Sequence, residues 1–329
     1  MYTKLGDDPL KSGQTLEVGV VTAPDAEFAG AIQHLLVHKG PEWEVHIRAA
    51  LRGETDQLET RFYVGLLDGV PAANVMTVET DGIGILGHVF TAPQQRRKGI
   101  CQAIMRRLME HFRERKGHVL LLSTGYESPP YRIYHSFGFR SLKGGFMRYD
   151  APAADALEQR WFSVDAVRTA TLAWRHWPLL GLLGAQTSGE ALRSAAWKLF
   201  GMGSLEGPVV HTLAAQSEGR GTNGVVLEAG LGAVVGCATL HPTGGGTNGW
   251  PGVWLLDLFS HPDFASHYSE MLTALQWPSG KFIAYVDTGS SEKAAALERH
   301  GFEREGTLRG FLRPGPEPVD VWVYGRIVN

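Results

Sequence analysis

The 329-residue chain has few of the features that mark several large protein classes. Its two cysteines, Cys101 and Cys237, lie far apart, which excludes a disulfide framework and favours a reducing compartment. The most hydrophobic stretch, residues 174–184, contains Arg175 and Pro178 and is far too short for the ~20 apolar residues of a membrane span. The first eight residues lack the apolar segment of a secretory signal. We therefore expect a cytoplasmic protein with no membrane partner.

The chain also lacks an excess of charge of one sign. Its 31 basic and 34 acidic residues give a net charge of −3, whereas nucleic-acid-binding proteins typically carry a strong basic excess. We therefore expect no nucleic-acid partner. The histidines show no metal-binding pattern, because His34 and His38 share a helical face but no third ligand follows at a recognisable spacing. We expect no metal site.

What the chain does contain is typical of a globular α/β protein, at 43% hydrophobic and 20% charged residues. The first half predicts the order β-α-α-β-β-β-α-β-α-β. The turn pairs Asp68-Gly69 and Asp81-Gly82 separate strands as in hairpins. Residues 1–14 are polar and are expected to form a flexible N-terminus. The expected strands are 16–21, 61–67, 70–78, 83–91 and 119–123, and the expected helices are 27–38, 42–51, 96–116 and one that begins at Pro129 and ends at Gly138.

A change of composition at residues 150–155 indicates a linker, and the two halves on either side of it resemble each other. Gly301-Phe302 repeats Gly138-Phe139, and His261-Pro262 repeats Ala92-Pro93, in the same order along the chain. Between Pro262 and Gly301 we expect a helix at 264–276 and a strand at 282–286, in the same order as in the first half. The Gly-rich loop at 243–252 accounts for the extra length of the second copy. We interpret residues 15–150 and 151–329 as two copies of one α/β unit.

The segment Pro93–Cys101 joins a predicted strand to a predicted helix and contains the pattern R-x-x-G-x-C. The first N–H groups of a helix have no partner inside it, and together with the helix dipole they bind anions. Gly99 allows a ligand to approach the backbone closely, and three cations precede it. A pyrophosphate suits this place; the alternative is a helix start with a solvated basic face.

This strand–loop–helix, with Tyr134 in the next helix and Gly138-Phe139 after it, resembles the GNAT superfamily of acetyl-CoA-dependent N-acetyltransferases. The family carries [QR]-x-x-G-x-[GA] here, and Arg96, Gly99 and Cys101 fall on its three defined places, with Cys101 departing from Gly or Ala. The detailed resemblance covers about residues 60–149. It implies an α/β (α+β) fold of two GNAT-like units, each a mixed, mostly antiparallel twisted sheet flanked by helices.

The resemblance also implies roles for named residues. The family's cofactor-binding strand matches residues 85–91, where a backbone N–H faces the thioester carbonyl, and its thiolate-protonating tyrosine matches Tyr134, with Tyr131 as the rival one helical turn away. The implied acetyl-CoA-binding residues are Val89, Phe90, Thr91, Arg96, Arg97, Lys98, Gly99, Ile100 and Cys101.

The general base is poorly defined by the resemblance. The family's Glu or His positions on the strand fall on Ile85 and Gly87, which cannot act as bases. His88 is adjacent but should face the other side of the strand, because successive side chains alternate. His88 is the candidate base, Glu79 and His46 are weaker ones, and a water chain or an already neutral amine would serve equally.

The second copy lacks these parts: its loop at residues 263–269 has no glycine and no arginine, Asp263 in it would repel phosphate, and Leu297 stands where Tyr134 would be. We expect a degenerate copy that shapes the acceptor pocket, binds a regulator or covers the first sheet. The expected function is transfer of an acetyl group from acetyl-CoA to a primary amine on a small molecule or peptide. The alternatives are a non-catalytic acetyl-CoA sensor or scaffold and a transferase of a longer acyl group. The acceptor and the oligomeric state are not defined by the sequence.

Overall fold

The computed structural model describes residues 1–152, 154–187, 189–243 and 250–329. Its contacts divide the chain into two compact units, residues 1–157 with 173–181 and residues 158–172 with 182–329. Each unit contains one large, mostly antiparallel sheet flanked by helices, so the predicted fold class is confirmed. The central part of the expected Gly-rich loop, residues 244–249, and residue 153 of the expected linker lie outside the described residues.

The first unit is built on an eight-stranded sheet with the order β1-β2-β3-β4-β5-β6-β8-β7. Neighbouring strands are antiparallel except for β5 and β6, which are parallel. The strands are β1 (Tyr2–Pro9), β2 (Thr15–Thr22), β3 (Glu59–Leu67), β4 (Val70–Thr80), β5 (Ile83–Thr91), β6 (Val119–Ser123), β7 (Arg140–Lys143) and β8 (Phe146–Asp150).

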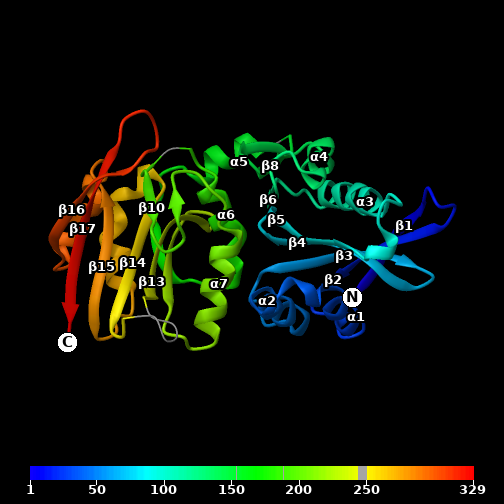
Figure 1. The fold of residues 1–329 in the computed structure, drawn as a ribbon, viewed down its shortest axis with the longest axis horizontal. Helices are drawn as coiled ribbons and strands as arrows, with labels where there is room; N and C mark the ends of the chain where they lie inside the picture. Colours follow the sequence, from blue (N-terminus) through cyan, green and yellow to red (C-terminus); the bar gives the residue numbers. More distant parts are fainter. Residues whose placement is uncertain (153, 188, 244–249) are drawn as a thin grey trace. The chain divides into compact units, whose positions relative to one another are not determined.

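The helices of the first unit cover both faces of this sheet. Helices α1 (Ala29–Leu36) and α2 (Pro41–Arg52) lie on one side, and α3 (Ile100–Glu114) and α4 (Pro129–Ser136) lie on the other (Figure 1). Helix α3 turns one apolar face to the sheet, and Ile104, Leu108 and Phe112 are completely buried there. The resulting core holds α3 against the strands that carry the candidate site.

The expected flexible N-terminus is corrected by β1, which pairs with β2 from Tyr2 to Pro9. As an edge strand, β1 needs only one buried face, so its polar composition does not prevent pairing. Asp8 is buried beneath α3, where its carboxylate receives hydrogen bonds from Arg106 at 2.6 Å and Arg107 at 2.9 Å. Those two ion pairs tie the first strand to the helix that begins the candidate site.

The two predicted hairpins are present where the sequence places them. Asp68, Gly69, Asp81 and Gly82 all have positive φ, between 50° and 77°, as the tight turns between β3, β4 and β5 require. The second turn sets the register of β5, which spans residues 83–91 as predicted.

Residues 173–181 come from the second half of the sequence but belong to the first unit. Trp174 and Trp177 pack against His46 of α2, with ring centroids 5.3 and 4.9 Å away. Gly181 passes so close to β5 and β6 that a Cβ placed there would lie 3.2 Å from Leu121. Both tryptophans are therefore core residues of the first unit.

The second unit repeats seven of the eight strands of the first sheet, and β1 has no counterpart among its described strands. Its seven strands have the order β9-β12-β13-β14-β15-β17-β16, which matches β2-β3-β4-β5-β6-β8-β7, and its one parallel pair among the described strands, β14 with β15, corresponds to β5 with β6. The strands are β9 (Val167–Thr171), β12 (Asn223–Ala229), β13 (Ala233–Pro242), β14 (Val253–Ser260), β15 (Gly280–Asp287), β16 (Glu303–Leu312) and β17 (Val319–Val328).

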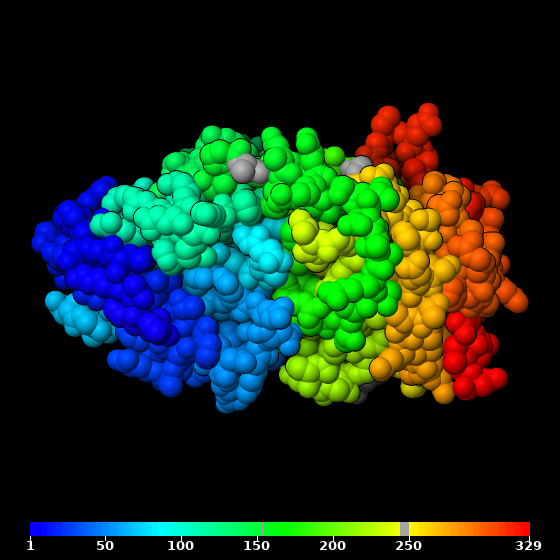
Figure 2. Space-filling view, turned by 180° about the vertical axis from the view of Figure 1, so that it is seen from behind, coloured from blue at the N-terminus to red at the C-terminus, as the bar shows by residue number. Residues whose placement is uncertain are grey.

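The remaining helices are short. They are α5 (Ala154–Trp161), α6 (Trp177–Gly184), α7 (Glu206–Ser217), α8 (Tyr268–Ala274) and α9 (Ser291–Arg299), and a six-residue 3₁₀ helix, Pro262–His267, leads into α8. The turn between β16 and β17 projects from the surface of this unit (Figure 2). Among the described helices none is long and apolar enough to cross a bilayer.

A small hairpin, β10 (Leu192–Ser194) with β11 (Leu199–Phe200), distinguishes the second unit from the first. Strands β14 and β15 pair only over residues 253–256 and 281–284, and the hairpin lies where they separate. Asp257 of β14 accepts hydrogen bonds from the Ser194 hydroxyl and from the amides of Ala195 and Ala196, at 2.8 and 3.0 Å. Asp287, at the end of β15, accepts one from the Leu192 amide at 3.0 Å. Two strand carboxylates therefore fix the hairpin in the gap.

We predict that Asp257→Ala destabilises the protein by about 3 kcal/mol. The substitution leaves buried amides and a hydroxyl without an acceptor, and each such group costs about 1–3 kcal/mol. Urea unfolding followed by circular dichroism measures the change. The control is Asp263→Ala, at an exposed carboxylate on the neighbouring 3₁₀ helix, which should change stability by less than about 0.5 kcal/mol. An unfolding midpoint for Asp257→Ala equal to that of the parent would show that this carboxylate does not hold the hairpin.

Candidate active site

The site begins where β5 and β6 separate. The two strands pair only at residues 83–85 with 119–121, although β5 continues to Thr91. Within the described chain no strand pairs with the open side of β5 beyond that point. Residues 86–91 therefore present a free strand edge, which offers backbone groups to a ligand.

The alternation of peptide groups determines which of them face the gap. Ala92, just after β5, donates its amide hydrogen to the carbonyl of Ala72 in β4, at 2.9 Å. Counting back along an extended strand, Phe90 also directs its N–H and C=O toward β4, whereas Val89 and Thr91 direct theirs toward the gap. Two side chains support this orientation, because Lys39 Nζ donates to the Val89 carbonyl at 3.3 Å and Arg96 Nε donates to the Thr91 carbonyl at 3.2 Å.

The loop after β5 carries a second set of backbone donors. The first hydrogen bond into α3 runs from the Ala103 amide to the Gly99 carbonyl at 3.1 Å, and the amides of residues 97–102 donate to no other group in the described parts of the chain. Arg97 and Gly99 have φ of +65° and +89°, which folds the loop back on itself so that successive amides line a concave turn. A Cβ built on Gly99 would meet nothing within 4 Å, so the space above the loop is open.

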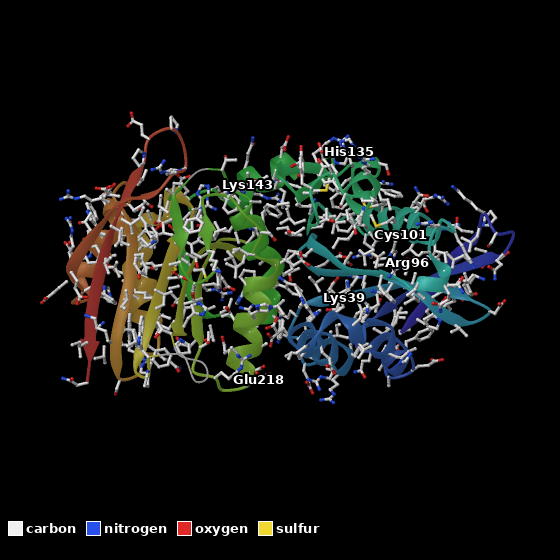
Figure 3. The ribbon with its side chains drawn as sticks, in the orientation of Figure 1. Lys39, Arg96, Cys101, His135, Lys143 and Glu218 are labelled. Atoms are coloured by element: carbon white, nitrogen blue, oxygen red, sulfur yellow. The ribbon has the colours of Figure 1, made fainter. Side chains whose placement is uncertain are left out.

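Three cationic residues, Arg96, Arg97 and Lys98, belong to this turn. The Arg96 guanidinium is held to β5 through Nε, and Lys98 donates to the Gln95 side chain at 2.6 Å. Ile100 is buried beneath the loop, so the loop is anchored to the core while its amides face outward. Figure 3 labels Lys39, Arg96 and Cys101, which come from three separate segments around the end of β5. The arrangement is a basic turn with unpartnered amides at the start of a fifteen-residue helix, and such turns favour anions.

Cys101 packs against the core in the first turn of α3. Burial raises the pKa of its thiol to about 11, because the thiolate would lose its hydration. The side chain is therefore protonated at neutral pH and is a poor nucleophile.

Tyr134 and Tyr131 lie on α4 but in different surroundings. Helix α4 starts with two prolines and is capped by Ser128, whose hydroxyl accepts from the Tyr131 amide at 3.3 Å. Tyr134 is buried in the same core as α3 and packs against Phe139, with ring centroids 6.1 Å apart. Tyr131 is only half-buried, between Tyr126 and His135. Of the two, Tyr134 is the one enclosed on the side of the sheet where α3 starts.

His88 lies at an irregularity in β5. Its φ is +47°, and the register with β4 shifts between Asn74 and Met76, so a β-bulge interrupts the alternation assumed from the sequence. The ring packs against Trp43 of α2 with centroids 5.0 Å apart. Its Nε2 atom is buried with no hydrogen-bond partner in the described residues, and burial together with nearby cationic groups lowers the pKa of His88 to about 3. The imidazole is therefore neutral.

The two weaker candidate bases are both engaged elsewhere. The Glu79 carboxylate accepts from Arg115 at 2.8 and 2.9 Å and from the Thr77 hydroxyl at 2.6 Å. His46 is completely buried between α2 and the segment that carries Trp174 and Trp177, and burial lowers its pKa to about 3. Both side chains have structural partners that account for their positions.

In the second unit, the gap between β14 and β15 is occupied by protein. Its strands separate in the same way, but the β10–β11 hairpin lies between them. A cavity of about 560 Å³ remains beside the hairpin. Its lining includes the carboxylates of Glu190, Asp287 and Glu292, and Glu190 is paired with buried Lys293 at 2.7 Å. Among the described residues, no group of three or more metal-ligating side chains is assembled in either unit.

Lys39 is the residue near the site that the sequence analysis missed. It lies in the 3₁₀ turn Val37–Lys39 between α1 and α2, which carries no motif, and it contacts β5 fifty residues further along the chain. A basic residue in a loop between two helices gives no local signal for such a contact.

Comparison with known proteins supports the resemblance proposed from the sequence. Residues 76–142, which include β5, the basic turn before α3 and Tyr134, match the family model described as "Acetyltransferase (GNAT) domain". No curated protein matches the chain.

Solved structures with similarity to the chain include two named acetyltransferases. A ribosomal-protein-alanine N-acetyltransferase from Brucella melitensis is 19% identical, covers 50% of this chain and 99% of its own, and gives a TM-score of 0.36. A GNAT superfamily phosphinothricin acetyltransferase from Sinorhizobium meliloti, solved in complex with AcCoA, is 17% identical, covers 50% of this chain and 88% of its own, and gives a TM-score of 0.37. The similarity that carries weight is the match to the domain model: residues 76–142 of this chain are similar to an acetyltransferase domain of the GNAT family.

Proposed function

We propose that the first unit transfers an acetyl group from acetyl-CoA to a primary amine by direct attack of the amine on the thioester. One observation carries the proposal: the gap-facing N–H groups of β5 lead directly to the unpartnered amides at the start of α3. Both sets of donors lie within residues 76–142, which match the acetyltransferase domain. A thioester followed by a pyrophosphate is the kind of ligand that needs donors at two such places.

The pyrophosphate would be held at the turn before α3. The amides of residues 97–102 and the positive end of the helix dipole favour an anion there, and Arg96, Arg97 and Lys98 add charge. The open space above Gly99 lets phosphate oxygens approach the backbone. Cys101 fits as a small, protonated side chain packed beneath the turn.

The thioester carbonyl would accept a hydrogen bond from the Val89 N–H. Negative charge develops on that oxygen during attack, and a fixed backbone donor stabilises it without reorganisation. Thr91 N–H points the same way and would bind the pantetheine arm. Phe90 directs its peptide groups to β4, and its role would be limited to its ring, which packs on His38 with centroids 4.0 Å apart.

Tyr134 would donate a proton or a hydrogen bond to the departing thiolate. Its side chain is buried in the core on the α3 side of the sheet, which fixes the ring in place. A CoA thiol has a pKa comparable to the ~8.5 of cysteine, so a phenol of pKa about 10 assists mainly by hydrogen bonding.

His88 is retained as the candidate base, in a limited role. Its imidazole is neutral and can accept a proton, but a conjugate acid with a pKa of about 3 makes it a weak base. No strong base is needed if the acceptor amine binds in its neutral form, or if a water molecule carries the amine proton to solvent.

We predict that Gly99→Glu weakens acetyl-CoA binding about a hundredfold or more, because like charges brought together in a complex cost several kcal/mol. Calorimetric titration measures the affinity. The matched control is Gly144→Glu, because Gly144 also has a positive φ, +56°, and open space around its Cβ position but lies in the turn between β7 and β8. Binding by Gly99→Glu at the parental affinity would place the cofactor elsewhere.

We predict one acetyl-CoA site per chain. In the second unit the gap is filled by the β10–β11 hairpin, and the remaining cavity is lined by carboxylates that would repel phosphate. The same calorimetric titration gives the stoichiometry. A value near two would contradict the proposal that the second copy has lost the cofactor.

We predict that Tyr134→Phe lowers kcat about a hundredfold, at the low end of the roughly 10²–10⁴-fold typical of general acid catalysis. The KM for acetyl-CoA should change little, because the interaction forms mainly in the transition state. A thiol-release assay with a panel of amines measures both constants, and Tyr131→Phe on the same helix is the control. If only Tyr131→Phe loses activity, the acid is one helical turn away. If acetyl-CoA binds but no amine releases thiol, the non-catalytic sensor becomes the better description.

A further inference from the structure

Lys39 places a primary amine at the edge of β5. The residue ends the 3₁₀ turn that follows α1, and its Nζ atom donates to the Val89 carbonyl at 3.3 Å. Because this turn lies between α1 and α2, the side chain reaches the strand from the side of the sheet that those helices cover. The side chain is half-buried. Lys39 is labelled in Figure 3 together with Arg96, which contacts the same strand two residues further on.

This contact brings the amine close to the proposed position of the thioester. In an extended residue the N–H and C=O groups point in the same direction, so a ligand oxygen bound to the Val89 N–H is the neighbour of an ammonium bound to the Val89 C=O. The amine would then need to move only slightly to reach the ~3–3.5 Å separation of a near-attack geometry.

The residue before Lys39 carries a proton acceptor. The His38 imidazole precedes Lys39 in the chain and packs on the ring of Phe90 with centroids 4.0 Å apart. Burial and the charges of Lys39 and Arg96 lower the pKa of His38, so its ring is neutral. A neutral imidazole at this place can take a proton from a lysine ammonium.

We propose that Lys39 is a site of self-acetylation. The inference rests on the proposed function, because it uses acetyl-CoA bound along β5. The Lys39 ammonium first loses one proton. Its Nζ then forms a C–N bond to the acetyl carbon as the C–S bond breaks, the nitrogen loses its second proton, and the thiolate takes up one. The products are N-acetyl-Lys39, free CoA thiol and one proton released to solvent.

This modification would change the site that produces it. The acetylated side chain loses its positive charge, and its acetyl group would occupy the place next to Val89 from which an acceptor amine approaches. Self-acetylation would therefore compete with transfer to an external amine and lower the rate of later turnovers.

The test is incubation of the full-length chain with acetyl-CoA and no acceptor, followed by intact mass and peptide mapping. We expect one added acetyl group, located on Lys39. Its yield should exceed that in Gly99→Glu by about a hundredfold, because a held reactant gains a large effective concentration. Lys39→Arg keeps the cation and should carry no acetyl group at this position or elsewhere, whereas Lys143→Arg, on β7, should be modified like the parent.

Acetyl-CoA binding is measured in parallel by calorimetry, so that the two proposals fail separately. If acetyl-CoA binds and external amines are acetylated while Lys39 stays unmodified, self-acetylation is wrong and the proposed function stands. Equal acetylation of Lys39 in the parent and in Gly99→Glu would mean uncatalysed chemistry and would also overturn the inference. If acetyl-CoA does not bind the parent at all, both proposals are wrong.

Discussion

The candidate site depends on the need of backbone N–H and C=O groups for hydrogen-bond partners. Strands β5 and β6 pair over only three residues, so the rest of β5 must satisfy its exposed edge in another way. Lys39 and Arg96 occupy the gap-facing carbonyls of Val89 and Thr91. Because these two carbonyls already have donors, the groups that the edge of β5 still offers to a ligand are its N–H donors. An edge of donors favours carbonyl ligands and developing negative charge.

The second unit meets the same requirement without a ligand. Its strands separate at the equivalent place, but Asp257 and Asp287 bind the backbone of a hairpin that comes from the same chain. The two sheets share one topology, yet one gap presents donors and cations and the other is filled and rimmed with carboxylates. The same sheet topology can therefore leave the gap open or fill it, depending on a few side chains and one inserted hairpin.

The sequence predicted local features well and distant contacts poorly. Strand β5 was predicted to the residue, because Asp81-Gly82 before it and Pro93 after it define its ends. Strand β1 was missed, since a polar edge strand resembles a loose tail. The facing of His88 could not be derived by alternation, because a bulge with positive φ lies at that residue. The contact between Lys39 and Val89 spans fifty residues and leaves no mark in either local pattern.

The placement of residues 173–181 has a consequence for how such a chain could arise and be divided. The polypeptide leaves the first unit, contributes β9 to the second, returns to the first with Trp174 and Trp177, and leaves again. No single cut can release either unit intact, and a truncation after the first copy would remove two tryptophans from around His46. Because the first unit depends on a segment that follows β9 of the second, neither unit can be inherited or expressed without part of the other.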